Sequence, residues 1–284
     1  MVPPRLALLT SITMLAFAGN SILCRLALTT TSLDAASFTT IRILSGAVML
    51  ALLVALRSRG SLWGGSWISA ASLLAYAAGF SFAYIALPAA TGALLLFGAV
   101  QGTMVGYGLV SGERLNVRQL IGIVLALSGL LILFLPGLET PPLLGSLLMI
   151  GAGVAWGLYS LRGRGLGDPT KATAGNFIRA VPLAIAISLI MWPSTNWDGV
   201  GAAYAVASGA LASGVGYAIW YAVLPFLQAT TAATVQLSVP AIAAIGGVVF
   251  LGEPISIQLA LSSVAILGGV CIYIVSKREA ATAL

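Results

Sequence analysis

The sequence has no histidine and only two cysteines, Cys24 and Cys271, among its 284 residues. These shortages exclude a Cys/His zinc site, the attachment of a c-type haem and a Ser–His pair for acyl transfer. Both cysteines lie in apolar runs near opposite ends of the chain, which favours two small buried side chains over a disulfide. We therefore expect neither a metal nor a cofactor in this protein.

Charged residues are also scarce: they account for 7% of the chain, whereas an ordinary soluble domain contains about 25%. Apolar residues make up 60%, and the mean hydropathy of +1.07 excludes a soluble globule, which presents polar atoms over much of its surface. The apolar runs, such as residues 121–135, do not alternate in polarity as the strands of an outer-membrane barrel do. Because helices are the remaining way to satisfy the backbone in lipid, the sequence predicts an all-α polytopic membrane protein.

Charges, prolines and polar clusters divide the chain into ten apolar stretches, each near the roughly 20 residues that a helix needs to cross a bilayer. The first stretch contains Ala16-Phe17-Ala18, which is similar to a signal-peptidase site, but its apolar run is too long for a signal peptide and we expect it to remain uncleaved. The ten predicted spans are residues 6–27, 35–56, 67–87, 90–111, 116–135, 143–161, 172–192, 200–222, 228–251 and 256–276.

Basic residues indicate the orientation, because lysine and arginine hold short loops in the cytoplasm. With the amino terminus inside, ten of the thirteen basic residues fall on the cytoplasmic side and none in an outer loop; Arg25, Arg42 and Arg179 lie within spans. They occur in ones and twos, so the pI of about 9.7 reflects topology rather than a surface for nucleic acid. We expect a multi-pass protein of a bacterial-type inner (plasma) membrane with both termini cytoplasmic.

The chain also matches itself weakly, residues 1–137 against residues 138–284. Each half contains five predicted spans, an odd number, so the second half is expected to be inverted relative to the first, as in many secondary transporters. Equivalent positions include Arg42 and Arg179, Tyr84 and Tyr221, and the pairs Gly112-Glu113 and Gly252-Glu253.

These features resemble the drug/metabolite transporter superfamily and its EamA-type ten-helix exporters. The resemblance rests on two five-helix halves, a tyrosine-rich third helix in each, a Gly-Glu pair near the start of each last helix, and Pro240 in the fourth helix of the second half. The first half departs from this pattern, with Val100 in place of the proline, so its fourth helix is expected to be straighter. The resemblance covers essentially the whole chain and implies a secondary transporter. Family members of this size include amino-acid exporters, among which the aromatic-amino-acid exporter group is one candidate.

Aromatic residues recur on helix faces that the repeat makes equivalent, since i, i+3, i+4 spacing places side chains on one side of a helix. An aromatic belt at the membrane interface accounts for Tyr84 and Tyr221 near span ends, whereas a cavity wall and plain packing are equally good explanations for most of the others. The aromatic candidates for a substrate cavity are Tyr76, Phe80, Trp156, Tyr159, Tyr217 and Trp220. The polar candidates near mid-membrane are Asn20, Gln101, Asn176, Gln236 and Ser238.

Arg42 and Arg179 each lie about eight residues into a span, which is about 12 Å from a membrane face at 1.5 Å per residue. Structural bonds to backbone carbonyls, or a side chain that reaches toward the interface, are the favoured interpretation. The alternative is a pair of gate or carboxylate-steering residues on opposite sides of one cavity. Pro182 and Pro240 are predicted helix breaks, which leave the carbonyls of Ile178 and Gln236 without their helical donors.

Two further patterns indicate structure rather than chemistry. Gly98, Gly102 and Gly106 recur every four residues, a spacing that lets helices pack closely. Each Gly-Glu pair precedes a helix, where a carboxylate can cap exposed N–H groups.

The acidic residues all fall at span ends or in loops, so no carboxylate pair is expected at mid-membrane for catalysis. Together with the lack of histidine, this argues against an enzyme, and it favours facilitated export or exchange over a proton relay.

The sequence predicts an exporter of small amphipathic metabolites, foremost amino acids with apolar or aromatic side chains, that works by alternating access. Efflux of drugs or lipophilic cations, which usually needs a carboxylate in the membrane, is the alternative within transport. A channel or a structural membrane subunit is the alternative outside it. The expected partners are the small-molecule substrate and the lipid bilayer; the sequence does not predict the oligomeric state.

Overall fold

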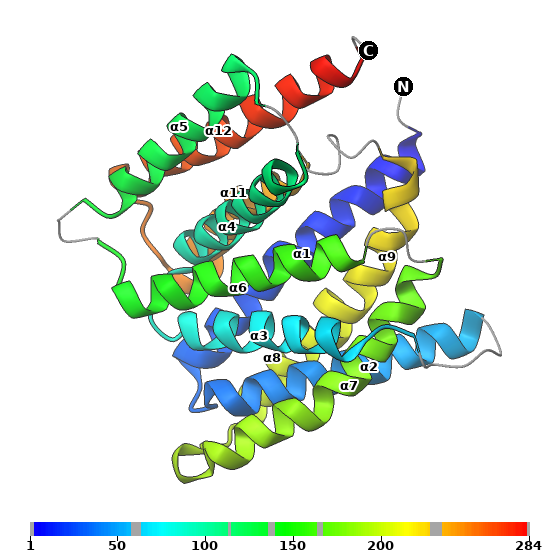
Figure 1. Ribbon diagram of the computed structural model, residues 1–284. Coiled ribbons are helices and arrows are strands. Elements are labelled where there is room, and N and C mark those ends of the chain that lie inside the picture. Colours follow the sequence, from blue (N-terminus) through cyan, green and yellow to red (C-terminus); the bar gives the residue numbers. More distant parts are fainter. Residues whose placement is uncertain are drawn as a thin grey trace.

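The structure is a computed structural model that describes residues 3–57, 64–112, 115–135, 140–163, 167–227 and 235–282. Within these ranges the chain is helical and contains no strand, which confirms the all-α prediction (Figure 1). Glu113, a member of the first Gly-Glu pair, lies outside the described residues. The main helices are α1 (Pro4–Thr30), α2 (Ala35–Arg57), α3 (Trp67–Ala83), α4 (Ala89–Val110), α5 (Val117–Leu133), α6 (Leu143–Arg162), α7 (Pro169–Ile190), α8 (Gly199–Val206), α9 (Gly216–Val223), α11 (Ser238–Leu251) and α12 (Ile257–Thr282).

A π-helical segment, η2 (Ala207–Val215), joins α8 to α9, so that these three segments form one continuous apolar rod. Each of the ten predicted spans thus overlaps a helical rod; of the ninth, residues 228–251, the part 228–234 lies outside the described residues and α11 begins at Ser238. In the described part of the chain, seven rods are long and apolar enough to cross a membrane, and α3, α5 and α11 are shorter. Helix α3 ends at Ala83, four residues before its predicted end at residue 87. A turn follows, in which the backbone N–H groups of Ala86 and Leu87 both donate to the carbonyl of Ala83, and Pro88 has no N–H with which to continue the helix.

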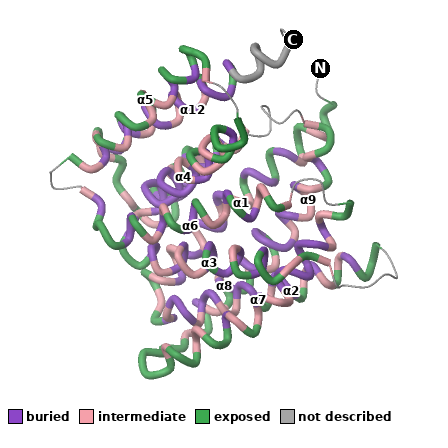
Figure 2. Tube along the Cα trace, in the orientation of Figure 1, coloured by how far each residue is buried: buried purple, intermediate pink, exposed green. Residues whose placement is uncertain are grey.

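The distribution of polarity is the reverse of that in a soluble protein. Leu44, Val48, Leu52 and Leu56 lie one turn apart on α2 and are all exposed, while Arg42 on the same helix is 1% exposed. Buried residues line the inward faces of the helices, and exposed ones cover the outside of the bundle (Figure 2). An apolar exterior around a partly polar interior is the arrangement expected of a polytopic membrane protein.

Helices α5 and α12 pack against each other along one side of the bundle (Figure 1). Glycine permits this close approach: a Cβ atom on Gly122 would lie 2.6 Å from the carbonyl oxygen of Gly269. Between this pair and α4 is an apolar cleft of about 400 Å³, lined in part by Gly98, Gly102 and Gly106. Among the described residues, no other helix comes within 4 Å of a Cβ atom on Gly102 or Gly106, so the close helix contact predicted from this glycine stripe is wrong at these two positions.

Side chains in the connections fix several helix starts. Asn116 and Gln119 form a reciprocal capping box at α5, and the Asp168 carboxylate accepts from the backbone N–H of Lys171 at α7. At α8 the Asp198 carboxylate accepts from the backbone N–H of Gly201 at 2.8 Å, and this hydrogen bond lowers the pKa of Asp198 below its usual value.

Candidate functional site

Five of the six aromatic rings that line one cavity inside the bundle come from four rods: Phe17 of α1, Tyr76 and Phe80 of α3, Trp156 of α6 and Tyr217 of α9. The ring centroid of Trp156 lies 4.9 Å from that of Tyr76 and 5.1 Å from that of Tyr217. The rings surround a cavity with about 20 Å³ of space open to the centre of a water molecule, which is room for about one water. We call this the central cavity; its remaining lining residues are Asn20, Leu96, Phe97 and Ala212.

Arg42 of α2 lies directly behind two of these rings. Its guanidinium carbon is 5.1 Å from the ring centroid of Tyr76 and 4.8 Å from that of Phe80. Its Nη2 donates to the Tyr76 hydroxyl at 2.9 Å, and its Nε donates to the Ser213 hydroxyl at 3.5 Å. The third nitrogen, Nη1, is buried without a hydrogen-bond partner in the part of the chain that the structure describes. Nη1 of Arg42 can therefore donate a hydrogen bond to a further acceptor group.

Asn20 joins this arginine to the π-helical segment. Its amide nitrogen donates to the Tyr76 hydroxyl at 3.2 Å, and its amide oxygen accepts from the Ser208 hydroxyl. Ser208 and Ser213 both come from η2, and sequence reasoning missed them. A serine in an apolar helix is common, and nothing in the sequence marked this stretch as π-helical, although π-helical turns occur frequently at functional sites.

A second pocket, of about 210 Å³, lies where α3 and α7 begin and α6 ends. We call it the polar pocket, because Ser66, Ser69, Tyr159, Arg162, Thr173, Asn176 and Tyr221 contribute to its lining. The Asn176 amide nitrogen donates to the Tyr159 hydroxyl at 3.2 Å, and the backbone N–H of Ser66 donates to the Asn176 amide oxygen at 2.9 Å. The rings of Tyr159 and Trp156 stack with centroids 5.4 Å apart. This stacked pair therefore has one ring on the polar pocket and the other on the central cavity.

The remaining predicted site residues lie elsewhere. Trp220 is buried against Phe17, with ring centroids 6.0 Å apart, and Gln101 lines the apolar cleft beside α4. Ser238 is exposed and donates to the carbonyl of Val235, and Gln236 is partly buried in the turn before α11. The helix break predicted at Pro182 is wrong, because α7 continues through this exposed proline, whereas Pro240 is buried in the first turn of α11. None of these side chains belongs to the lining of the central cavity.

Arg179 of α7, the counterpart of Arg42 in the proposed repeat, contacts backbone carbonyl groups. Its Nη1 donates to the carbonyl oxygens of Gly64 and Gly175. Arg42 and Arg179 therefore occupy equivalent places in the sequence but different chemical surroundings.

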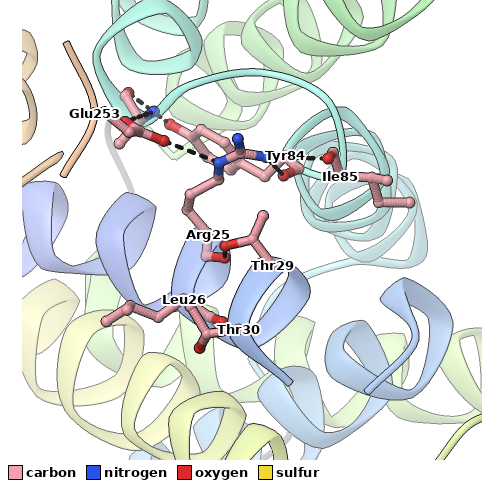
Figure 3. A network of polar contacts seen from close by, with 8 residues as sticks. Arg25, Leu26, Thr29, Thr30, Tyr84, Ile85 and Glu253 are labelled. Atoms are coloured by element: carbon pink, nitrogen blue, oxygen red, sulfur yellow. Dashed lines mark hydrogen bonds and ion pairs between the residues drawn. The ribbon is translucent and has the colours of Figure 1, made fainter. Parts of the chain in front are cut away.

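A network of polar contacts connects α1 with two connections at the end of the bundle where α4 begins (Figure 3). Arg25 forms an ion pair with Glu253 at 3.0 Å and donates to the backbone carbonyls of Tyr84 and Ile85. The other oxygen of Glu253 accepts from the backbone N–H of Ala89 at 2.7 Å. The Gly-Glu pair thus caps the first turn of α4, not the helix that follows it in sequence. Sequence reasoning missed this contact, since it depends on which helices are neighbours.

The fold and these contacts define a polytopic membrane protein with a small aromatic cavity inside its helix bundle. The EamA-like transporter family matches residues 143–275. The uncharacterized protein PA1977 of Pseudomonas aeruginosa is 54% identical over 96% of both chains. The uncharacterized transporter YoaV of Bacillus subtilis is 26% identical over 56% of this chain and 57% of its own. The threonine/homoserine exporter RhtA of Escherichia coli K12 is 32% identical over 49% of each chain.

Residues 143–275 carry an EamA-like transporter domain, and this match, with the similarity to YoaV and RhtA, supports the drug/metabolite transporter superfamily. The chain spans about half the length of YoaV and RhtA. A solved crystal structure has the same fold, with a TM-score of 0.66 and 21% identity over 94% of this chain and 99% of that chain. The family and the named relatives indicate a transporter rather than an enzyme.

Proposed function

We propose that the protein is a secondary transporter of the inner membrane that exports small amphipathic metabolites, foremost amino acids with apolar or aromatic side chains. It works by alternating access of two inverted five-helix halves, residues 1–137 and 138–284. The helix contacts support this division. In the two halves, α1 corresponds to α6, α3 to α9 and α4 to α11. The contact of α3 with α6 therefore corresponds to the contact of α1 with α9, and the contact of α4 with α6 corresponds to that of α1 with α11; all four contacts are present. The pairs α2–α7 and α5–α12 each join two counterparts, as a two-fold relation requires.

The observation that carries the proposal is the central cavity, which is lined by both halves. Tyr76 and Phe80 come from the first half, and Trp156 and Tyr217 come from the second. A substrate site at the interface between two repeats is exposed to one side or the other when the repeats move relative to each other. Aromatic walls offer apolar surface to a ring or an aliphatic side chain, which favours amphipathic substrates.

Two groups of polar contacts at opposite ends of α3 support an arrangement for export. The distribution of lysine and arginine in the loops places the polar pocket on the cytoplasmic side and the Arg25–Glu253 network on the outer side. The polar pocket would then receive substrate from the cytoplasm, and the network would hold the outer end closed. RhtA, by its name an exporter of threonine and homoserine, supports amino acids as the substrate class.

Coupling to a proton gradient is not part of the proposal. Proton-driven transporters commonly place an Asp, Glu or His inside the membrane, and this chain has no histidine. Glu253 lies between helices α1 and α4, where its carboxylate forms an ion pair with Arg25. We propose facilitated export or exchange.

Counterflow into proteoliposomes tests the function. Vesicles that contain the purified protein and an excess of unlabelled phenylalanine, leucine or threonine should accumulate the labelled amino acid transiently, and an added protonophore should change this little. Uptake of lipophilic cations instead would favour drug efflux, and ionic current in planar bilayers would favour a channel. If no amino acid is exchanged, the proposed function is wrong.

A further inference from the structure

Three arginines, Arg25, Arg42 and Arg179, lie well inside the predicted membrane spans, and their side chains have different partners. Arg25 faces the carboxylate of Glu253, and Arg179 donates to two backbone carbonyl oxygens. Arg42 donates to two hydroxyl groups, and its Nη1 is buried without a partner in the described part of the chain. Among these three arginines, Arg42 is therefore the one with a buried N–H donor, Nη1, that has no acceptor in the described part of the chain.

The charge of Arg42 makes this open donor significant. Arginine remains protonated in proteins, and this side chain is 1% exposed. The rings of Tyr76 and Phe80 attract a cation through their π faces but carry no net negative charge. A buried charge without a counterion is strongly unfavourable. The surroundings of Arg42 thus lack one negative charge within the described residues.

Tyr76 connects this cation to the central cavity. Its ring lines the cavity, and its hydroxyl accepts hydrogen bonds from Arg42 and from Asn20. Arg42 itself lies behind the lining, at 4.8 Å from the ring centroid of Phe80. A group that enters the cavity therefore contacts Tyr76, which separates it from the positive charge of Arg42.

We propose that Arg42 and Tyr76 form a receptor for the carboxylate group of the substrate. The inference rests on the proposed function and narrows it: the site takes molecules that carry a carboxylate, amino acids among them, and rejects organic cations that lack one. The carboxylate supplies the missing negative charge to Arg42, and the apolar part of the substrate packs on Trp156 and Tyr217. Since the cavity has room for about one water, substrate binding requires the Tyr76 and Phe80 rings to move and widen it.

Four probes with the same phenyl group test the receptor on the wild-type protein. Phenylalanine and 3-phenylpropionate carry a carboxylate, whereas phenylalaninamide and 2-phenylethylamine do not. We measure thermal stabilisation of the detergent-purified protein by each probe, and inhibition of phenylalanine counterflow in proteoliposomes. The two carboxylates should act at concentrations about tenfold lower than the two amines, because a hydrogen bond between charged groups contributes at least that factor. Equal potency of all four probes overturns the receptor.

The two readouts separate this inference from the function on which it rests. Stabilisation by carboxylates without any counterflow supports the receptor and contradicts the transporter. Counterflow with no preference for carboxylates supports the transporter and contradicts the receptor.

Variants of Arg42 and Tyr76 test whether these two residues cause the preference for carboxylate probes. Arg42→Gln should make the four probes equivalent within about twofold, Arg42→Lys should keep part of the carboxylate preference because it keeps the charge, and Tyr76→Phe should reduce it. Arg118→Gln removes the same charge from an exposed position on α5 and should leave the wild-type ratio unchanged. If Arg42→Gln does not yield folded protein, Tyr76→Phe, which keeps the ring, decides the question. A wild-type ratio in Arg42→Gln, or in both Tyr76→Phe and Arg42→Lys, overturns the assignment.

Discussion

Trp156 is the residue through which the polar pocket and the central cavity meet. Its ring contacts Tyr76, Tyr159 and Tyr217, all with centroids within 5.4 Å. Aromatic pairs contribute about 0.5–1.5 kcal/mol each beyond the area they bury. We predict that Trp156→Ala lowers phenylalanine counterflow at least two- to tenfold, a range that follows from one such pair, at unchanged expression. Trp156→Phe should recover much of the activity. Parental counterflow by Trp156→Ala, measured beside the control Arg118→Ala, would mean that this ring does not face the substrate.

Residue patterns predicted the aromatic part of the central cavity better than its polar part. Helical spacing places Tyr76 and Phe80 on one face, and it does so whatever the helix packs against. The partners of Arg42 could not be obtained in this way. Ser213 reaches Arg42 from a different rod, more than 170 residues further along the chain, and only the three-dimensional arrangement brings the two together.

At the scale of helices, the Arg25–Glu253 network joins α1 to the first turn of α4 and to the α11–α12 connection (Figure 3). Both side chains are mostly buried, 17% and 13% exposed, so loss of one charge leaves the other poorly solvated. We predict that Glu253→Gln lowers the free energy of unfolding by about 1–3 kcal/mol, the usual cost of leaving a buried partner unsatisfied. Thermal unfolding of the purified protein measures this as a lower Tm.

A double-mutant cycle shows whether the ion pair itself is responsible. Arg25→Gln combined with Glu253→Gln should cost less than the sum of the two single changes, because the second change removes a charge that has already lost its partner. Asp198→Asn is the matched control: it also neutralises an acid at a helix start, and asparagine caps helices as well as aspartate does. Additive losses in the cycle would contradict the role of the ion pair.

Helix existence was predicted well, whereas helix contacts were not. Long apolar runs predict spans because the bilayer requires them, and each predicted span overlaps a helical rod in the described part of the chain. The glycine stripe of α4 predicts a close helix neighbour, but Gly102 and Gly106 face the apolar cleft. The tight contact forms instead between Gly122 of α5 and Gly269 of α12. Small residues permit close packing without specifying the partner, so spacing alone could not distinguish the two cases.

At the scale of the whole molecule, the start of α1 and the end of α12 lie at the same end of the bundle, as an even number of crossings requires (Figure 1). The loop charges extend this to an orientation, since no predicted outer loop contains lysine or arginine. Two exposed residues test the orientation and the span count together: Ser111 follows α4, and Thr195 precedes α8. Three helices, α5, α6 and α7, lie between them in the chain, so the ten-span topology predicts that the two residues are on opposite sides of the membrane.

We predict that, after Cys24 and Cys271 are replaced by alanine, Thr195→Cys reacts with a membrane-impermeant thiol reagent in intact cells. Ser111→Cys should react only after the membrane has been permeabilised, because the basic residues near it hold that connection in the cytoplasm. Mass-shift labelling of the purified variants measures both. If only Ser111→Cys reacts in intact cells, the orientation is the opposite of the predicted one, and so is the proposed direction of transport. Equal reaction of both cysteines in intact cells would mean that one of the three helices between them does not cross the membrane, and α5, with 17 residues, would be the first to re-examine.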